Sequence, residues 1–388
     1  MQASNLQERR LTIAAPAESP GKRLLFLLIA IGLVGLHLSF SHAYWAPAHY
    51  GNNQNAYLVA GKLLATRGTS GFEPQTPWEF VGWMWNMADG ASAAPGGGWH
   101  YPKYPLGLPV LNAIVYRLGH WLGGPETAID WTFKVSPVCT AVAAFAVFLI
   151  TRLLAGSFAG ILAMISFSTL TVVLVLMNNP YSHAADVAFV CCGMYALIRW
   201  WQCGRCWWGV LAGFLLGFAA TIRYTEGLLV LPILAAILGS MRWHRPVGWI
   251  VAAVISATAT IVALVVYSKQ GTGAAGVITA LLIAASIPLI VMLIVMIADG
   301  HGRMLLRLSV PLVAWAFPLA VLVVYNLLTI GSPTGYDSTN ESTGFSLAEL
   351  QRKWRWGIDQ LYNTGLYILL PLSAAGMLMA FRWNWRVA

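Results

Sequence analysis

The sequence predicts an all-α, polytopic membrane protein, and three observations support this prediction. Of the 388 residues, 58% are hydrophobic and 10% are charged, whereas a soluble domain carries about 25% charged residues. The mean hydropathy of the chain is +0.67. The apolar residues occur in runs of about 20, the length of a membrane-spanning helix, and about ten such runs follow one another.

Most of the predicted spans are joined by short polar turns. The fifth and sixth are short and are interrupted at Arg223–Glu226. The stretch Gly107–Leu122 is apolar too, but a proline and several polar residues interrupt it, so we expect a helix that lies at the membrane surface. The spans are expected near residues 24–43, 132–153, 157–177, 184–201, 207–223, 226–241, 247–267, 276–298, 308–329 and 363–381.

The lysines and arginines predict the orientation of the chain. They concentrate in the N-terminal tail, residues 1–23, and in short turns such as those at Arg152, Arg199 and residues 242–245. Basic residues in short loops favour the cytoplasmic side of a membrane. We therefore expect a cytoplasmic N-terminus and an exoplasmic position for the long first loop, residues 44–131.

This layout predicts a single domain embedded in one membrane. We expect residues 24–388 to form a single transmembrane domain behind the cytoplasmic tail, in the plasma membrane, which is the inner membrane of a bacterium. The net charge of +9 is explained by the basic turns, so nucleic-acid binding is not expected. Cys203 and Cys206 have CxxC spacing but no second ligand pair, so no zinc or redox centre is expected there.

Three ionisable residues interrupt apolar sequence on the predicted exoplasmic face. Charges in such positions usually face a cavity or each other. Arg223 and Glu226 form either a local helix-end pair or part of a phosphate site, for which a guanidinium group is well suited. Asp186 is either a charge favoured by a helix dipole or a carboxylate that faces the cavity as a hydrogen-bond acceptor or towards a metal.

The exoplasmic histidines do not have the spacing of a metal site. His42 and His49 lack the i, i+4 spacing of a helical ligand pair, and His100 and His183 are distant in the sequence. We therefore expect no metal bound by these residues. A divalent cation that accompanies a phosphate group stays an open alternative.

Five short stretches of the chain are informative through their order along the sequence and through the membrane face on which all of them are predicted. Asn53 and Tyr57, in the first, precede an amphipathic stretch that ends near Gly68. The others are Tyr101–Pro109, Asn179–Asp186, Ile222–Leu229, and Tyr325-Asn326 with Gly331–Tyr336. Together they resemble the GT-C glycosyltransferases, which include protein O-mannosyltransferases and aminoarabinose transferases, over most of residues 24–381.

The resemblance implies a GT-C-like fold with juxtamembrane helices in the first loop. It also implies transfer of a sugar from a polyprenyl-phosphate-linked donor, held in the membrane, to an acceptor on the exoplasmic face. In the family an aspartate of the first loop is the base for the acceptor hydroxyl. The matching residue here is Asn53, whose amide cannot take up a proton, and no acidic residue lies between Leu24 and Glu73.

The expected site therefore has three parts. Asp186 and Asn53 are assigned to the catalytic position, with Glu73, Asp89 and Asp337 as other candidates for the missing carboxylate. Arg223 and Lys103 are expected to bind the donor phosphate. The residues expected to line the substrate cavity are Tyr57, Tyr104, His183, Glu226 and Tyr336.

Two other functions stay open from the sequence. With an amide at Asn53, the chain is alternatively a catalytically inactive GT-C-fold subunit, a scaffold that binds a protein partner through its tryptophan-rich exoplasmic loop. A transporter is less favoured, because many transporters carry paired repeats and no internal repeat is evident here. The sequence identifies neither the sugar nor the acceptor.

Overall fold

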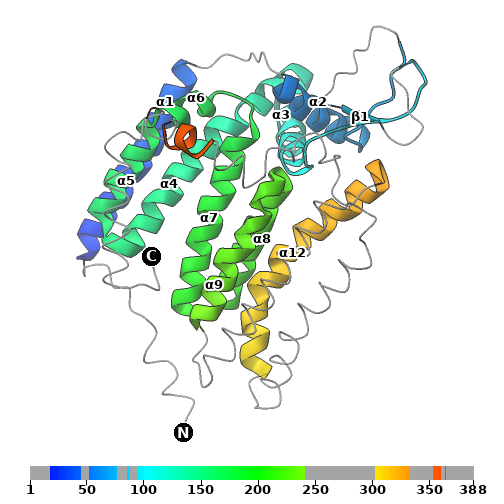
Figure 1. Cartoon of the computed structure of the whole chain (residues 1–388). Coiled ribbons are helices and arrows are strands. Elements are labelled where there is room, and N and C mark those ends of the chain that lie inside the picture. Colours follow the sequence, from blue (N-terminus) through cyan, green and yellow to red (C-terminus); the bar gives the residue numbers. More distant parts are fainter. Residues whose placement is uncertain are drawn as a thin grey trace. The chain divides into compact units, whose positions relative to one another are not determined.

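The computed structural model of the chain describes residues 18–44, 52–76, 85–87, 94–240, 302–331, 353–359 and 363, and these are mostly helical (Figure 1). The chain divides into two compact units. The first consists of Met1–Leu234 with Pro311–Ala388, and the second of Ala235–Val310. The predicted spans 247–267 and 276–298, and all of 363–381 except residue 363, lie outside the described residues.

In Met1–Leu234, the first part of the first unit, the structure describes eight α-helices, one 3-10 helix and a small sheet. The antiparallel strands are β1 (Trp85–Met87) and β2 (His100–Pro102). The helices are α1 (Pro20–Ala43), α2 (Asn52–Arg67), α3 (Gly107–Phe133), α4 (Val135–Ala155), α5 (Ser157–Thr169), α6 (Thr171–Met177), α7 (Ser182–Cys203), α8 (Cys206–Ile222) and the 3-10 helix η1 (Tyr224–Leu229). Two further helices, α9 (Val230–Ser240) and α12 (Gly302–Ile330), each have one end in either unit.

Helices α1, α4 and α5 pack around a small apolar core. Ala30, Phe148 and Met164 are each 0% exposed there. Helices α1 and α5 begin at the same end, where the backbone N–H of Ser157 donates to Glu18 Oε1 at 2.7 Å. The chain therefore runs in the same direction in α1 and α5, which lie side by side, and α4 packs on both of them (Figure 1).

The predicted span 157–177 is not one helix, which corrects that expectation. Leu170 has an extended conformation, with φ −60° and ψ 131°, between the end of α5 and the start of α6. The Thr169 hydroxyl donates to the Ile165 carbonyl at 2.9 Å. Such bonds offer the backbone an alternative partner, and β-branched residues such as Thr169 and Thr171 are poor helix formers.

Helix α3 consists of two segments joined by a kink. The segment Gly107–Leu122, expected from the sequence as a helix, is helical. Gly123 and Gly124 then leave the helical conformation, and Gly124 has φ 82°, a value that favours glycine. Pro125 opens the second segment, a position where its missing N–H is tolerated. The position of α3 at the membrane surface stays a prediction.

Helices α7 and α8 form an antiparallel pair. Gly204, with φ 62°, ends α7 and lets the chain reverse at once into α8. On an adjacent face of α8, Gly213 lies against the Pro311 carbonyl and Gly217 against the Trp315 backbone of α12. Higher numbers in α8 meet higher numbers in α12, so these two helices run in the same direction, as the predicted order of spans also has it.

Four of the described helices are long and apolar enough to cross a membrane. They are Pro20–Ala43, Val135–Ala155, Ser182–Cys203 and Leu306–Ile330, and they match the predicted spans 24–43, 132–153, 184–201 and 308–329. Shorter apolar helices stand at the predicted spans 157–177, 207–223 and 226–241. The chain is thus a multi-pass membrane protein, while the total of about ten spans stays a prediction.

Candidate functional site

The candidate site lies at the end of the first unit where α7 begins and α8 ends. Arg223 follows α8 in an extended conformation, with φ −142° and ψ 123°, and it separates α8 from η1. The interruption expected at Arg223–Glu226 is therefore present. Because α7 and α8 are antiparallel, this break brings Arg223 back beside the first turn of α7.

Arg223 contacts two side chains of that first turn. Its Nη1 donates to His183 Nδ1 and lies 3.3 Å from His183 Nε2. Its Nε lies 3.9 Å from Asp186 Oδ2. Because a guanidinium group only donates hydrogen bonds, the His183 nitrogen that it contacts must be an acceptor. His183 is therefore unprotonated at that nitrogen.

Asp186 is buried, and only one side of its carboxylate faces the arginine. Its Oδ1 has no hydrogen-bond partner among the described residues. Glu226, on η1, is close enough to interact electrostatically with this carboxylate. A buried oxygen without a partner destabilises the fold by about 1–3 kcal/mol. Such an oxygen is chemically useful where a substrate proton supplies the missing partner.

The first-loop residues expected in the cavity pack beside this group. Tyr57 of α2 and Tyr104, just before α3, lie with ring centroids 4.6 Å apart. They belong to one cluster with Ala185 and Ile222, the neighbours in sequence of Asp186 and Arg223. The structure thus brings together the first-loop helix, the YPKYP stretch, the start of α7 and the end of α8, as the sequence predicted.

Helix α3 is held against α8 by very close packing. A Cβ atom on Gly107 would lie 2.6 Å from the Thr221 hydroxyl and 2.7 Å from its carbonyl oxygen. Gly61 of α2 packs as closely on Asn112 of α3, and the Asn112 amide donates to the Tyr57 carbonyl at 3.2 Å. These contacts fix the first-loop helices relative to the end of α8.

Of the remaining predicted residues, Asn53 and Lys103 are described by the structure. Asn53 is half-buried in the first turn of α2, on the same helical face as Tyr57. Lys103 is half-buried next to Tyr104. Tyr336 lies outside the described residues.

Of the other carboxylates considered for the catalytic position, Glu73 is the one that the structure describes. Glu73 is half-buried in the first loop, where its backbone carbonyl accepts from Gln75 at 3.1 Å. Asp89 and Asp337 lie outside the described residues. Within the part of the chain that the structure describes, Asp186 is the aspartate paired with Arg223.

Two ties to α12 were not expected from the sequence. The Asn326 amide donates to the Tyr224 hydroxyl at 3.4 Å, and the Tyr325 hydroxyl is hydrogen-bonded to Ser70 of the first loop. Adjacent residues of α12 therefore hold both the turn after Arg223 and the loop after α2. Tyr325-Asn326 was part of the resemblance, but nothing in the sequence around Ser70 indicated its partner.

A metal centre has no ligand set in the described residues. No group of three or more His, Cys, Asp or Glu side chains in this part of the chain is arranged to hold an ion. His183 contacts Arg223 instead. A divalent cation carried with the phosphate of a substrate stays the alternative that the sequence left open.

Comparison with known proteins supports the resemblance found in the sequence. The family model described as dolichyl-phosphate-mannose-protein mannosyltransferase matches residues 105–268. This segment contains His183, Asp186, Arg223 and Glu226, while Asn53 precedes it. No curated protein and no solved structure matches the chain.

Proposed function

We propose that this chain is a membrane glycosyltransferase of the mannosyltransferase type. It transfers a sugar from a polyprenyl-phosphate-linked donor to an acceptor hydroxyl on the exoplasmic face. The observation that carries the proposal is the pairing of Arg223 with the buried Asp186 inside the segment that matches the mannosyltransferase family. The four candidate spanning helices suit an enzyme whose donor lies in the bilayer.

Arg223 is proposed to bind the donor phosphate. A guanidinium group presents paired donors that suit phosphate oxygens, and the side chain of Arg223 keeps 33% of its surface exposed. His183 occupies Nη1, which leaves other N–H groups of the guanidinium for a ligand. Lys103, half-buried in the first loop, is proposed as a second cation for the same phosphate.

Asp186 is proposed as the general base. The acceptor oxygen forms a bond to the anomeric carbon of the sugar while the bond from that carbon to the phosphate oxygen breaks. The proton of the acceptor hydroxyl passes to Asp186 Oδ1, the oxygen without a partner, and the lipid phosphate leaves with its charge beside Arg223. A base placed in this way contributes about 10²–10⁴-fold to the rate.

The aromatic residues of the first loop are proposed to line the substrate cavity. Tyr57 and Tyr104 pack on the neighbours of the Arg223–Asp186 pair, and Glu226 lies near the same carboxylate. Tyrosine rings give apolar faces for a sugar or an isoprenoid chain and hydroxyls for hydrogen bonds. Tyr336 is proposed for the same cavity on the strength of the sequence resemblance.

The proposal is tested with the full-length chain in bacterial inner-membrane vesicles, supplied with a radiolabelled polyprenyl-phosphate mannose and the membrane extract as the source of acceptor. Arg223→Ala is expected to abolish transfer, and Arg223→Lys to restore part of it, because a lysine keeps the charge and loses the paired geometry. Arg117→Ala is a matched control, since this exposed arginine lies on α3. Full activity of Arg223→Ala at equal expression would overturn the proposal.

A non-catalytic scaffold is the second candidate function, and one observation favours it. The first turn of α2 carries amides, Asn53 and Asn55, where the related enzymes carry a carboxylate. Purification in a stoichiometric complex, with no transfer to any lipid or protein acceptor, would support the scaffold. Arg223→Ala should then leave assembly unchanged, which separates the two candidates.

A further inference from the structure

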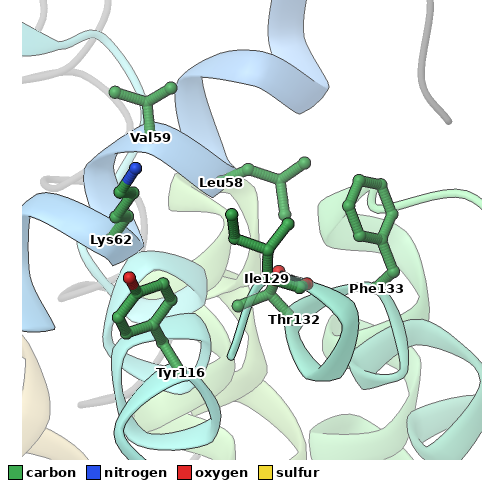
Figure 2. A pocket seen from close by; sticks show the side chains of 7 residues that line it. All are labelled: Leu58, Val59, Lys62, Tyr116, Ile129, Thr132 and Phe133. Carbon is green, nitrogen blue, oxygen red and sulfur yellow. Dashed lines mark hydrogen bonds between the residues drawn. The ribbon is translucent and has the colours of Figure 1, made fainter. Parts of the chain in front are cut away.

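A small apolar groove lies between α2 and α3, beside the candidate site and separate from it. Its cavity volume is about 160 Å³. Figure 2 shows Lys62 and Tyr116 at one end of the groove and Phe133 at the other. The lining residues are Leu58, Val59, Lys62, Tyr116, Ile129, Thr132 and Phe133.

The lining of this groove is suited to a hydrocarbon chain. The Thr132 hydroxyl is already bonded to the Ile129 carbonyl at 2.6 Å, so it offers little to a polar ligand. Ile129 is 44% exposed at the mouth, whereas Phe133 and Tyr116 are buried in the wall. The kink at Gly123–Gly124 separates the segment of α3 that supplies Tyr116 from the segment that supplies Ile129, Thr132 and Phe133.

Lys62 places a positive charge at the rim of the groove. Lys62 is exposed, and no carboxylate among the described residues lies within ion-pair distance of it. Arg67 and Arg117 are exposed nearby in the same pair of helices, and Arg117 Nε donates to the Ala65 carbonyl at 3.0 Å. Helix α2 and the first segment of α3 contain no acidic residue.

The first segment of α3 also carries an exposed apolar stripe. Ile114, Leu118, Trp121 and Leu122 recur at helical spacing and are 59%, 44%, 80% and 51% exposed. Apolar side chains flanked by basic ones are typical of helices that lie in the headgroup region of a bilayer. In a membrane protein, this stripe therefore places the α2–α3 pair against lipid.

We propose that the groove between α2 and α3 binds an anionic phospholipid of the bilayer. One acyl chain lies against Leu58, Ile129 and Phe133, and the phosphate pairs with the Lys62 ammonium group. The bilayer lipid is favoured over the lipid donor because Arg67 and Arg117 extend the positive charge beyond the groove, which suits a surface of many anionic headgroups. The proposal does not depend on transfer activity.

The experiment uses the full chain reconstituted in phosphatidylcholine vesicles that contain phosphatidylglycerol with a photoactivatable diazirine in one acyl chain. After irradiation and proteolysis, mass spectrometry is expected to find adducts in residues 58–62 and 129–133. Lys62→Glu should lower their yield about fivefold, because one basic residue contributes about 1 kcal/mol at an anionic surface. Arg67→Glu is the matched control, on the same helix but outside the groove. Its charge acts on the anionic surface only from a distance and is screened by salt, so this variant should lower the yield less than about twofold.

Three results would overturn the proposal. One is equal labelling of the groove by a diazirine probe built on phosphatidylcholine. Another is an unchanged adduct yield in Lys62→Glu, with the thermal stability of the variant measured to show that it is folded. The third is labelling by a photoactivatable polyprenyl phosphate in the absence of any adduct from phosphatidylglycerol, which would assign the groove to the donor.

Discussion

The two ends of the helix bundle each hold a carboxylate next to the start of a helix, and the two carboxylates are satisfied very differently. Glu18 accepts hydrogen bonds from the backbone N–H and the hydroxyl of Ser157, at 2.7 and 2.5 Å, and so caps α5. Asp186, in α7, has an arginine nitrogen 3.9 Å from one carboxylate oxygen and no partner among the described residues for the other. A carboxylate whose bonds are complete holds structure, whereas one with an unused buried oxygen is available for chemistry.

Asp186→Asn gives the largest expected effect and tests this contrast directly. Transfer should fall by about 10²–10⁴-fold, because an amide cannot accept the proton of the acceptor. Thermal stability in detergent should not fall, since the substitution removes a buried charge that is only partly compensated. Sugar transfer and the melting temperature are measured on the same preparation. Activity near that of the natural chain would contradict the role of Asp186.

Asn53→Asp tests the same contrast by adding a carboxylate, whereas Asp186→Asn removes one. It places a carboxylate at the position where the resemblance to GT-C glycosyltransferases implies one, four residues before Tyr57 on α2. In the Asp186→Asn background it should restore part of the lost transfer if both positions face the same substrate. The matched control is Asn55→Asp, since Asn55 is exposed and lies on another face of the helix. Equal rescue by both variants would show a non-specific charge effect.

Part of the arrangement could be predicted from the sequence. Ionisable residues in apolar sequence usually face a cavity or each other, and Arg223, Asp186 and His183 are indeed in contact, while the roles assigned to them stay predictions. The break at Leu170 was missed, because hydroxyl residues such as Thr169 and Thr171 also occur within spanning helices, and their effect depends on local hydrogen bonds such as that from Thr169 to the Ile165 carbonyl. The ties from α12 to Ser70 and Tyr224 depend on tertiary packing between distant segments, which no periodicity reveals.

Glu18→Gln is expected to have a small effect on stability and none on transfer. A glutamine keeps an oxygen that can accept from Ser157 but loses the charge, so the helix cap is weakened and not removed. The loss should be about 1 kcal/mol or less, because Glu18 is only half-buried and solvent screens its charge. A thermal-shift assay checks the stability, with Glu73→Gln as the matched control. Loss of transfer in Glu18→Gln at unchanged stability would break the distinction between the two ends.

The same carboxylate gives the chain an acid sensitivity with a defined sign. The hydrogen bonds from the Ser157 hydroxyl and N–H lower the pKa of Glu18 below its ordinary value of 4.5. Because the folded-state pKa lies below the unfolded-state value, Glu18 stabilises the fold fully above the unfolded pKa, and this contribution is lost as the pH falls through the folded pKa. The natural chain should therefore lose its stability advantage over Glu18→Gln when melting is compared at neutral pH and below pH 4.5. An advantage that persists undiminished in acid would mean that Ser157 packing, and not the charge of Glu18, holds the two helix starts together.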